Sequence, residues 1–587
     1  MAVEKLIVDH IDTWTTALQT RSTAGRGSSG KIDLYGIKKL RELILELAVR
    51  GKLVPQDPND EPASELLKRI AAEKAELVKQ GKIKKPKPLP EISEEEKPFE
   101  LPVGWEWVRL EKISTRIGSG STPKGGKNVY LETGVPFLRS QNIWNHGIKL
   151  EDIAFISSQT HNNMSNTHVM PNDILLNITG ASLGRCSIFP KTISEANVNQ
   201  HVTIIRLVSE DYVPFIHLAI ISPVIQREIW HRQVGMAIEG LSKKSLESFI
   251  FPIPPKNEQE SINKKVTELM SLCDQLEQHS LTSLDAHQQL VETLLTTLTD
   301  SQNADELAEN WARISEHFDT LFNTEASIDA LKQTILQLAV MGKLVPQDPN
   351  DEPASELLKR IAQEKAQLVK DGKMKKQKPL PPISDEEKPF ELPDGWVWCR
   401  LNDLFSFITD GDHQAPPKSD TGIPFLVIGN LNKGIVSFDE CKYVPIDYYE
   451  RLDWSRKPCQ GDVLYTVTGS YGIPIIVDNN EPFCVQRHVA ILKSCSNTPV
   501  TYLRYLFLSK YAYAYAEKIA TGIAQKTVPL TGLRLMPIPV PPNGTLLNII
   551  NLINLVDAIS ASLKLGIQSA KKNQLHLADA LTDAAIN

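Results

Sequence analysis

The stretch GKLVPQDPNDEPASELLKRIA occupies residues 51–71, and the same 21 residues recur unchanged at 342–362. The match extends on both sides, because residues 44–110 and 335–401 align without a gap and differ at only 12 positions. A long internal repeat indicates that one supersecondary unit occurs twice in the chain. We therefore expect two copies of one connector, with the rest of the chain arranged around them.

A long amphipathic helix is predicted in each half of the chain. Residues 269–300 align weakly with 552–583, and HIDTW at His10 resembles HFDTL at His317. About 37 residues at about 1.5 Å each make a rod of about 55 Å. We expect the two copies to pack antiparallel, because a narrow apolar stripe is typical of helix-to-helix packing. The stripe recurs at spacings of three and four and contains Ile262, Val266, Leu269, Leu272, Leu276, Leu290, Leu294 and Leu298.

Two blocks that barely resemble each other, about 111–255 and 402–542, lie between the repeated parts. Short runs of Val, Ile, Phe and Tyr alternate in them with Gly, Pro and Asn, which predicts strands and turns. Landmarks such as GVPFLRSQNI and GIPFLVIGNL still match, and short helices are expected at 213–231 and 501–519. Both blocks are therefore expected to share one fold that carries different surface residues.

The expected fold class is α+β, with two α/β domains separated by long antiparallel coiled-coil helices. An internal tandem repeat with pseudo-two-fold symmetry accompanies it. The expected boundaries are 1–109 for the N-terminal helical region and connector, 110–255 for the first variable domain, 256–400 for the central helical region and connector, 401–542 for the second variable domain, and 543–587 for the C-terminal helix.

Composition narrows the class of protein further. The 587 residues are 41% hydrophobic and 23% charged, and we expect no apolar run of the roughly 18 to 20 residues that span a membrane. The N-terminus mixes acidic residues into its apolar positions, which indicates neither a signal peptide nor an anchor, so a cytoplasmic protein is expected. The seven cysteines include no CxxC pair and favour neither disulfides nor a zinc site. No metal or cofactor is expected.

The formal net charge of −7 is not typical of a nucleic-acid-binding protein, which usually carries a basic excess. Net charge averages over parts with different roles, however. A partner subunit can also supply phosphate contacts.

Three motifs frame the variable blocks. Each block begins after a Gly-Trp-x-Trp motif, at residues 104–107 and 395–398, and the first ends in PIPP followed by Glu258 and Gln259. The second exit differs, with Gly544 and Thr545 where Glu-Gln would stand. Divergent blocks between repeated helical and connector segments resemble the specificity subunit of a type I restriction–modification system. The resemblance covers essentially the whole chain, and the GKLVPQ connector resembles one subgroup of these subunits.

The resemblance implies a division of labour within the chain. Each variable block would be a target-recognition domain for one half of a split sequence in double-stranded DNA. The repeated parts would form a helical spacer that docks two modification subunits, which are adenine methyltransferases, and through them restriction subunits. The chain itself would be non-catalytic. Near-identity in the connector agrees with one kind of partner bound twice, although recent duplication without shared function remains an alternative.

Loops between the strands are where we expect DNA contacts, because side-chain donors and acceptors read base edges while Lys and Arg bind phosphates. In the first block the candidates are Lys124, Lys127, Arg139, Gln141, Asn142, Thr179, Ser182, Arg185, Asn199, Gln200, Lys243 and Lys244. In the second block they are His413, Gln414, Lys418, Asn430, Thr468, Ser470, Tyr471, Gln486, Arg487, Gln525 and Lys526.

Several of these segments have structural interpretations that stay open. The glycine-rich loop at 118–128 lacks the spacing of a P-loop and also fits an ordinary loop. Arg139 fits a structural ion pair, and the TG-x-x-G turns at Thr179 and Thr468 fit glycine geometry alone. His201 and His488 occupy matching places in apolar strands and fit core positions. The lysine runs at 84–88 and 375–379 fit solvated linkers or contacts with DNA or a partner.

Catalytic motifs are missing from the sequence. We find neither the Pro-Pro-Tyr/Phe motif of adenine methyltransferases, nor a glycine-rich loop for S-adenosylmethionine, nor a Walker pair. The acidic stretches PNDEP and SEEEK leave a metal-dependent nuclease as one alternative. A two-headed scaffold for ligands other than DNA is the other.

Overall fold

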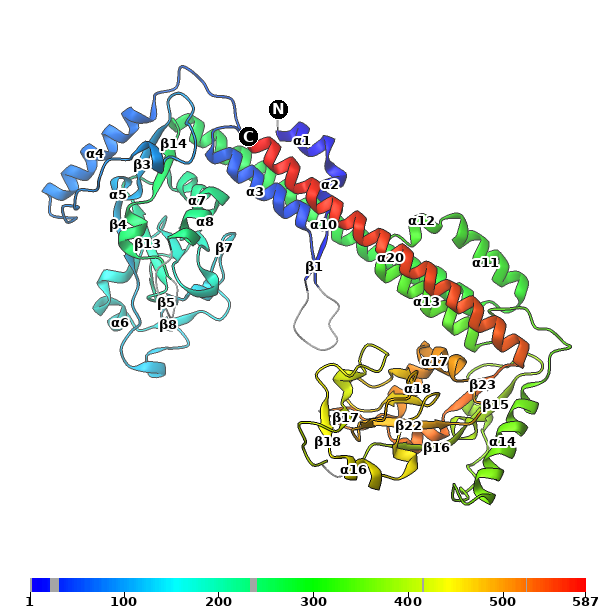
Figure 1. Ribbon diagram of the computed structural model, residues 1–587. Helices are drawn as coiled ribbons and strands as arrows, with labels where there is room; N and C mark the ends of the chain where they lie inside the picture. Colours follow the sequence, from blue (N-terminus) through cyan, green and yellow to red (C-terminus); the bar gives the residue numbers. More distant parts are fainter. Residues whose placement is uncertain (1–2, 22–30, 233–239, 414–415, 524) are drawn as a thin grey trace. The chain divides into compact units, whose positions relative to one another are not determined.

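A computed structural model gives the fold of residues 1–587 and describes all of them except 1–2, 22–30, 233–239, 414–415 and 524 (Figure 1). The chain divides into two compact units, unit 1 with residues 1–283 and 570–587, and unit 2 with residues 284–569. Each unit contains one connector, one variable block and a part of each long helix.

The two longest helices are α10 (Lys256–Asp300) and α20 (Asn543–Ile586), with 45 and 44 residues. At about 1.5 Å per residue each is about 66 Å long, which exceeds the length expected from the apolar stripe. The N-terminal part of α10 shares unit 1 with the C-terminal part of α20, and the opposite ends share unit 2. The two helices therefore run antiparallel, as predicted.

In unit 1 a third helix, α3 (Tyr35–Val49), joins the two long helices, whereas the sequence had predicted a two-helix coiled coil. The guanidinium of Arg41 donates to Asp274 and Glu277 of α10 at 2.7 and 2.9 Å. The Tyr35 hydroxyl donates to Asp579 of α20 at 2.7 Å. Five residues of the predicted stripe are buried or half-buried in this core: Ile262, Val266, Leu269, Leu272 and Leu276. Unit 1 also contains α1 (Val3–Asp9), α2 (Ile11–Thr16) and the hairpin of β1 (Gln19–Arg21) and β2 (Lys31–Asp33).

In unit 2 the corresponding third helix is α13 (Glu325–Val340), preceded by α11 (Ala304–Glu316) and α12 (Phe318–Leu321). Lys332 of α13 pairs with Asp557 of α20 at 2.8 Å, and Asp329 pairs with Lys564. The side chains that α10 and α13 bury together include Val291, Leu295, Leu298, Ile328 and Leu331. Each unit thus has a core made by three helices.

The two connectors fold into the same elements. They are α4 (Ala63–Lys79), η1 (Glu94–Glu96) and β3 (Glu106–Arg109) in unit 1, and α14 (Ala354–Lys370), η6 (Asp385–Glu387) and β15 (Val397–Arg400) in unit 2. The buried Arg109 binds the Glu96 carboxylate through two nitrogens, and Arg400 binds Glu387 in the same way. Near-identical sequence has therefore produced near-identical local structure.

A lysine of each connector binds the C-terminal end of a long helix. Lys52 donates to the carbonyl of Ile586 in α20 at 2.5 Å. Lys343 donates to the carbonyls of Thr299 and Ser301, at the end of α10, at 3.1 and 2.9 Å. The last carbonyls of a helix lack partners within the helix and favour a cation. The repeated sequence thus supplies a side chain that caps the C-terminal end of one long helix in each unit.

The variable block of unit 1 contains two four-stranded sheets, with strand orders β11-β10-β13-β4 and β8-β5-β12-β9. Their bounds are β4 (Ser114–Ser119), β5 (Val135–Leu138), β8 (Ala154–Ile156), β9 (His168–Val169), β10 (Ile174–Asn177), β11 (Cys186–Ile188), β12 (Ala196–Val198) and β13 (Val202–Leu207). The remaining elements are α5 (Leu110–Ile113), η2 (Gly126–Val129), η3 (Ser140–Asn142), β6 (Ile143–Trp144), β7 (Gly147–Ile148), α6 (Ser158–Asn163), η4 (Ser165–Thr167), η5 (Gly180–Ser182), α7 (Val213–Ile221), α8 (Pro223–His231), α9 (Lys243–Glu247) and β14 (Ile250–Ile253).

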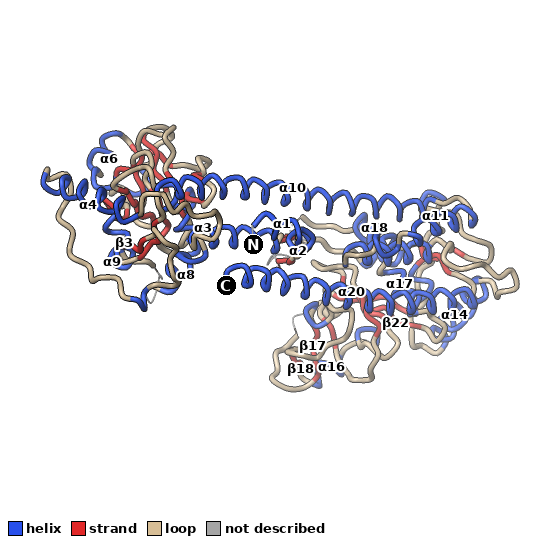
Figure 2. Tube along the Cα trace, turned by 90° about the horizontal axis from the view of Figure 1, so that it is seen from above, coloured by secondary structure: helices blue, strands red, loops and turns tan. Residues whose placement is uncertain are grey.

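The variable block of unit 2 keeps the four-stranded order of the first sheet, as β16-β22-β19-β20, whereas the described residues of its second sheet form three strands in the order β18-β17-β21. Its strands are β16 (Phe405–Asp410), β17 (Ile423–Leu426), β18 (Lys442–Val444), β19 (Val463–Thr466), β20 (Pro474–Ile476), β21 (Cys484–Val485), β22 (Val489–Ser494) and β23 (Pro537–Val540). Its helices are α15 (Leu401–Leu404), η7 (Ile428–Asn430), α16 (Ile446–Arg451), η8 (Trp454–Arg456), α17 (Val500–Phe507), α18 (Lys510–Ile519) and α19 (Leu530–Leu535). In Figure 2 most strands lie in the two variable blocks, whereas the parts outside them consist mainly of helices and loops, with the small hairpin of β1 and β2 beside α2. The expected α+β class is confirmed.

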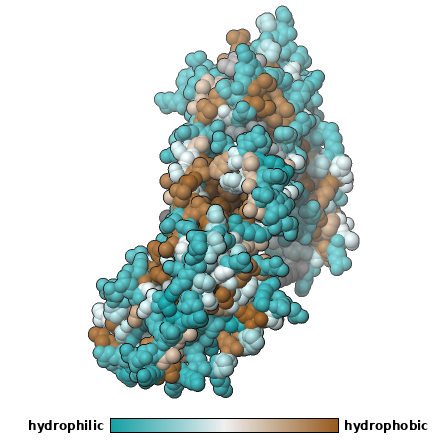
Figure 3. All heavy atoms as spheres, turned by 90° about the vertical axis from the view of Figure 1, so that its right-hand side faces the viewer, coloured by the Kyte–Doolittle hydropathy of each residue, from teal (hydrophilic) through white to brown (hydrophobic). Residues whose placement is uncertain are grey.

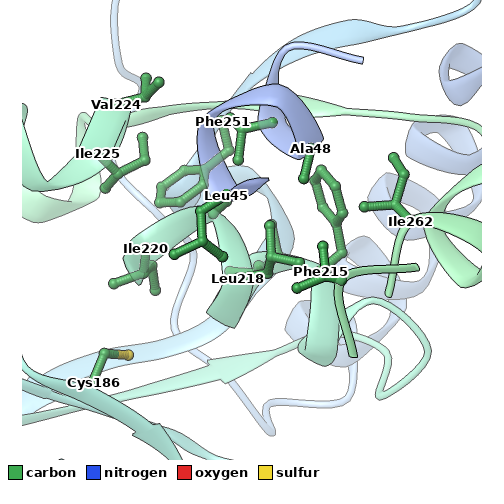
Figure 4. Packing of buried hydrophobic residues seen from close by; sticks show 14 of the residues in the cluster. Leu45, Ala48, Cys186, Phe215, Leu218, Ile220, Val224, Ile225, Phe251 and Ile262 are labelled. Carbon is green, nitrogen blue, oxygen red and sulfur yellow. The ribbon is translucent and has the colours of Figure 1, made fainter. Parts of the chain in front are cut away.

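In unit 1 one hydrophobic core links the helices to the variable block (Figure 4). Leu45 and Ala48 of α3 face Phe215 and Leu218 of α7, with Ile262 of α10 beside them. Burial of side chains of this size stabilises a fold by about 1.5–3 kcal/mol each. The variable block is therefore attached to its helices by shared apolar packing.

Helix α20 is long and apolar enough to cross a membrane by length and composition, which corrects the expectation of no such run. Part of its apolar surface is accounted for, because Leu546, Ile549 and Ile553 are buried in the core of unit 2. The face displayed in Figure 3 is mostly hydrophilic, with apolar side chains gathered in separate patches. A core helix of a soluble protein passes the same test of length and composition.

Candidate nucleic-acid interface

The loops of unit 1 that carry the predicted DNA-binding residues meet at one edge of the sheets. Strands β4 and β10 end at this edge, and the antiparallel β13 begins there. The amide of Asn199, after β12, donates to the carbonyl of Leu138 at the end of β5 at 3.1 Å. The backbone N–H of Ile178 donates to the carbonyl of His201 at 3.0 Å, and the backbone N–H of Leu241 donates to the carbonyl of Ile178 at 2.9 Å. Five segments that are distant in the sequence thus form one loop surface.

A glycine at the end of the first strand allows two of these loops to approach closely. A Cβ on Gly120 would lie 2.0 Å from the carbonyl oxygen of Val198, which no larger residue tolerates. A Cβ on Gly411 in unit 2 would lie equally close, at 2.0 Å, to the carbonyl oxygen of Val485. The two variable blocks therefore share the backbone path that brings these loops together.

Many of the predicted residues of unit 1 reach solvent at this edge. Lys124, Gln141, Gln200, Lys243 and Lys244 are exposed, and Arg139, Thr179, Ser182, Arg185 and Asn199 are half-buried. The side chain of Lys127 lies outside the described residues. Thr122 bonds the Gln200 amide, and the Thr179 hydroxyl lies 2.6 Å from Nδ1 of His201. This half-buried His201 is held beside the surface, not in the core as its apolar strand suggested.

Asn142 is an interior residue. It is 1% exposed, its Oδ1 accepts from the backbone amide of Arg139 at 3.0 Å, and its Nδ2 donates to the Lys149 carbonyl at 3.1 Å. Asn430 of unit 2 does the same between Val427 and Asp439. These two asparagines shape the turn after β5 and β17. Both side-chain amides are thus bonded to backbone groups of their own turn, unlike the exposed candidates at this edge.

An aromatic residue that sequence reasoning missed, Trp144, lies at the centre of a cationic cluster. The guanidinium carbon of Arg185 lies 3.8 Å from the centroid of the Trp144 ring, and the Lys149 ammonium lies 4.3 Å from it. The indole N–H donates to the carbonyl of Gln141 at 2.8 Å. Basic side chains next to aromatic rings are typical of nucleic-acid contacts. The interleaved letters WNHGIK at 144–149 carried this signal in the sequence.

The loops of unit 2 meet at the corresponding edge with other residues. Three backbone hydrogen bonds join them. The N–H groups of Gln486, Val467 and Gly469 donate to the carbonyls of Leu426, His488 and Lys526, each at 3.0 Å. Exposed candidates there are His413, Lys418, Ser470, Arg487, Gln525 and Lys526, while Gln486 and Tyr471 are half-buried. Gln414 lies outside the described residues. Thr468 is buried and accepts from the Thr527 hydroxyl at 3.3 Å, which fits the structural interpretation of its turn.

Two tyrosines add an aromatic surface to the loop edge of unit 2. The rings of Tyr471 and Tyr513 stack 5.9 Å apart with planes 12° from parallel. Burial and the neighbouring Tyr513 raise the pKa of Tyr471 to about 12, so its hydroxyl keeps its proton at neutral pH and can donate a hydrogen bond. Half of Tyr513 remains exposed. Tyr513 was absent from the sequence-based candidates.

The described residues contain no group of three or more His, Cys, Asp or Glu side chains suited to a metal ion. The acidic PNDEP stretch has a structural use instead, because Asp351 accepts from the backbone amides of Gly544 and Thr545 at 3.0 and 2.7 Å. In SEEEK, Glu96 binds Arg109. These carboxylates are thus bonded within the protein.

The two units share one backbone scaffold and carry different loop residues, and comparison with known proteins identifies the family. Residues 102–286 match the model of the type I restriction modification DNA specificity domain. The type I restriction enzyme EcoAI specificity subunit of Escherichia coli is 49% identical over all of both chains, and the EcoEI subunit of the same organism is 48% identical, also over all of both chains. The chain therefore belongs to the family of type I restriction enzyme specificity subunits, which are non-catalytic DNA-binding proteins.

Two further relatives match at lower identity. The EcoBI specificity subunit of Escherichia coli is 25% identical over half of this chain and 55% of its own. The crystal structure of the HsdS subunit from Thermoanaerobacter tengcongensis aligns with 83% of this chain and 98% of its own, with 18% identity and a TM-score of 0.39.

Proposed function

We propose that each variable block reads one half of a bipartite DNA target through its loop edge. The observation that carries this proposal is the pair of equivalent edges, which share one backbone scaffold but differ at exposed positions such as Gln200 and its counterpart Arg487. A shared scaffold positions loops in the same way, and different Arg, Lys, Gln and Asn side chains present different donors and acceptors to base edges.

Phosphate contacts complete the proposed interface. Lys124, Lys243 and Lys244 in unit 1, and Lys418 and Arg487 in unit 2, are exposed at or near the loop edges. Each phosphate neutralised by such a residue releases counterions, so the affinity for DNA is expected to fall steeply with salt. The formal charge of −7 opposes DNA elsewhere on the chain, which makes these local basic residues important for binding.

Docking of two modification subunits is the second part of the proposal. Within unit 2, α20 exposes Leu547, Leu555, Ile559 and Leu565 by 54, 56, 48 and 68%. At about 100° per residue these four side chains fall on one side of the helix. An apolar face of this kind suits a partner helix, and it is the part of α20 that the core of unit 2 does not cover. The modification subunits would thereby be delivered to an adenine in each half-site, with restriction subunits bound through them.

The continuous helices α10 and α20 are proposed to set the number of unread base pairs between the half-sites. The whole complex is proposed to act in the cytoplasm, where chromosomal or invading DNA is accessible. The domain boundaries 110–255 and 401–542 are proposed as the exchangeable recognition modules.

Exchange of residues 111–255 for the matching block of another family member tests this function. The complex of the hybrid chain with its modification subunits should methylate a target that differs from the original in one half-site only. Sequencing of methylated adenines in DNA from cells that express the complex measures both half-sites and their spacing. A change in both half-sites would contradict the modular assignment, and metal-dependent cutting by the chain alone would favour the nuclease alternative.

A further inference from the structure

Each unit carries a basic arm that the DNA-reading loops do not use. We define the first arm as α4 with residues 80–90 and the second arm as α14 with residues 371–381 (Figure 1). Beyond each helix the chain displays four lysines that are all exposed: Lys82, Lys84, Lys85 and Lys87 in the first arm, and Lys373, Lys375, Lys376 and Lys378 in the second. Among the ion pairs formed by the described residues, none involves any of these eight ammonium groups.

Both arms are fixed to their variable blocks at the root. Lys74 of α4 is buried and pairs with Glu111 at 2.6 Å, whereas the equivalent Lys365 donates to the carbonyl of Asn402 at 2.7 Å. The returning chain is held by Arg109, which donates to the carbonyl of Pro90 at 2.9 Å. Arg400 holds Pro381 in the same way at 3.1 Å. The lysines therefore extend from anchored backbone on both sides.

In the second arm the lysine cluster is itself bonded to the variable block of unit 2. Gln377, in the middle of the cluster, donates to the carbonyl of Ser406 at 2.9 Å and accepts from the Asn402 amide at 2.9 Å. Met374, next to Lys375, is 7% exposed. The alternation of buried and exposed residues holds the lysines on the outer surface. A solvated linker does not need such anchors.

The position of the arms separates them from the loop edges. Gln377 binds Ser406 near the start of β16, whereas the candidate loop with His413 and Lys418 follows the end of that strand at Asp410. Six residues of strand place these two ends about 17 Å apart. In unit 1, Glu111 at the root of the arm likewise precedes β4, and the 118–128 loop follows it. Lysines at this end of the sheet are poorly placed for the DNA that the loops would hold.

We propose that each lysine cluster docks an acidic surface of a modification subunit, so that one subunit binds per arm; this inference rests on the proposed function. All four lysine positions are shared by the two arms, although Ile83 is replaced by Met374 and Pro86 by Gln377. Loops that read different half-sites diverge, whereas a surface that meets the same partner twice stays equal. The eight exposed lysines form no ion pair within the described residues, although Lys375 lies near enough to Asp453 to help lower the pKa of that carboxyl. Such clusters suit carboxylates on the partner, and their attraction weakens with salt.

Charge reversal in one arm is the decisive experiment. The chain with Lys82→Glu, Lys84→Glu, Lys85→Glu and Lys87→Glu is co-expressed with its modification subunit, and the complex is weighed by native mass spectrometry. We expect one modification subunit per chain instead of two, and at least tenfold weaker assembly when both arms are reversed. The matched control replaces the same lysines with Arg, which keeps the charge, and should retain two subunits.

The alternatives give different outcomes in the same samples. If the reversed chains bind two modification subunits as wild type does, the inference is wrong. If assembly is normal but affinity for target DNA falls tenfold, the lysines contact phosphates and the inference is also wrong. Circular dichroism of each variant checks the fold, which exposed lysines should not change. Failure of the wild-type chain to bind any modification subunit would instead refute the proposed function itself.

Discussion

The two connectors contain the same 21 residues, yet the same aspartate makes different contacts in each unit. In unit 2 Asp351 accepts from the backbone amides of Gly544 and Thr545, at the start of α20. In unit 1 the equivalent Asp60 accepts from the side chain of Asn257 at 2.6 Å instead. A Cβ on Gly544 would lie 2.9 Å from the Asp351 carboxylate, so only glycine lets this carboxylate reach the backbone of α20. In unit 1 the equivalent residue is Asn257, whose side chain makes the contact instead.

The tryptophan of the Gly-Trp-x-Trp motif shows the same divergence. In unit 1 Trp105 donates to Glu258 at 2.9 Å, and Gln56 donates to the other oxygen of that carboxylate at 3.0 Å. Counted from the Pro-Pro pair, Thr545 stands in the place of Glu258 and Leu546 in that of Gln259, which corrects the expected match of Gly544 and Thr545 with Glu-Gln. In unit 2 Trp396 donates to Gln347 at 2.8 Å. The repeated sequence therefore adopts one backbone in both units, while its polar side chains bind the groups that the neighbouring non-repeated residues provide.

The largest effect is expected where the two units agree. Arg109→Ala and Arg400→Ala should each lower the free energy of unfolding by about 3 kcal/mol, because a buried guanidinium bonded to a carboxylate and to backbone carbonyls is lost. The hydrogen bonds of Arg400 lower the pKa of Glu387 to about 2, which reflects the strength of this contact. Urea unfolding followed by circular dichroism measures the loss. Unequal effects of the two substitutions would break the equivalence of the connectors.

A smaller effect should distinguish the two aspartates. Asp351→Ala should cost about 1 kcal/mol, because two backbone amides at the start of α20 lose their acceptor. Asp60→Ala should cost less than half as much, since only a side-chain amide loses a partner. Hydrogen exchange of the first turns of α20 and α10 locates each loss. Faster exchange at α10 in the Asp60 variant, equal to that at α20 in the Asp351 variant, would contradict the difference.

The cationic cluster around Trp144 in unit 1 should affect recognition of one half-site only. Trp144→Ala should weaken binding of target DNA by the assembled complex about fivefold, because a cation–π contact worth about 1 kcal/mol no longer positions Arg185. Trp144→Phe is the matched control and should retain most of the affinity. Fluorescence anisotropy with targets mutated in either half-site measures the effect. Loss of discrimination in the half-site read by unit 2 would count against the assignment.

The smallest expected effect is an opposite response to pH at the two helix starts. Burial of Asp351 opposes its charge, but the amides of Gly544 and Thr545 lower its pKa, so its stabilising contribution is present above the ordinary Asp pKa and disappears as the pH falls through the lowered value. Burial raises the pKa of Glu258, so its contribution is present below the ordinary Glu pKa and disappears as the pH rises through the raised value.

Thermal unfolding at pH 3 and pH 6 tests these signs. The destabilisation by Asp351→Ala should be larger at pH 6 than at pH 3. The stability of Glu258→Gln relative to wild type should instead be higher at pH 6 than at pH 3. If the stability of both variants relative to wild type changed in the same direction between pH 3 and pH 6, the predicted opposite pKa shifts of Asp351 and Glu258 would be wrong.

The loop edges illustrate which parts of the site could be predicted from residues alone. Exposed candidates such as Lys124 and Arg487 follow from their place between predicted strands, because loops after strands reach the surface. Asn142 and Asn430 are indistinguishable from these candidates in the sequence. Their side-chain amides are nevertheless hydrogen-bonded to backbone groups that only the folded turn brings near. Trp144 gained its importance from Arg185, which is 41 residues away in the sequence.

The sequence by itself determined the repeat, the long amphipathic helices, the strand-rich blocks and the glycines that punctuate them, because these features depend on local periodicity and backbone preference. The tertiary structure alone decided that α3 and α13 join the long helices as third partners, that lysines of the connectors bind the far ends of those helices, and that five separate loops share one edge. Such contacts join residues from tens to more than 500 positions apart, and their energies depend on distances that no local pattern contains.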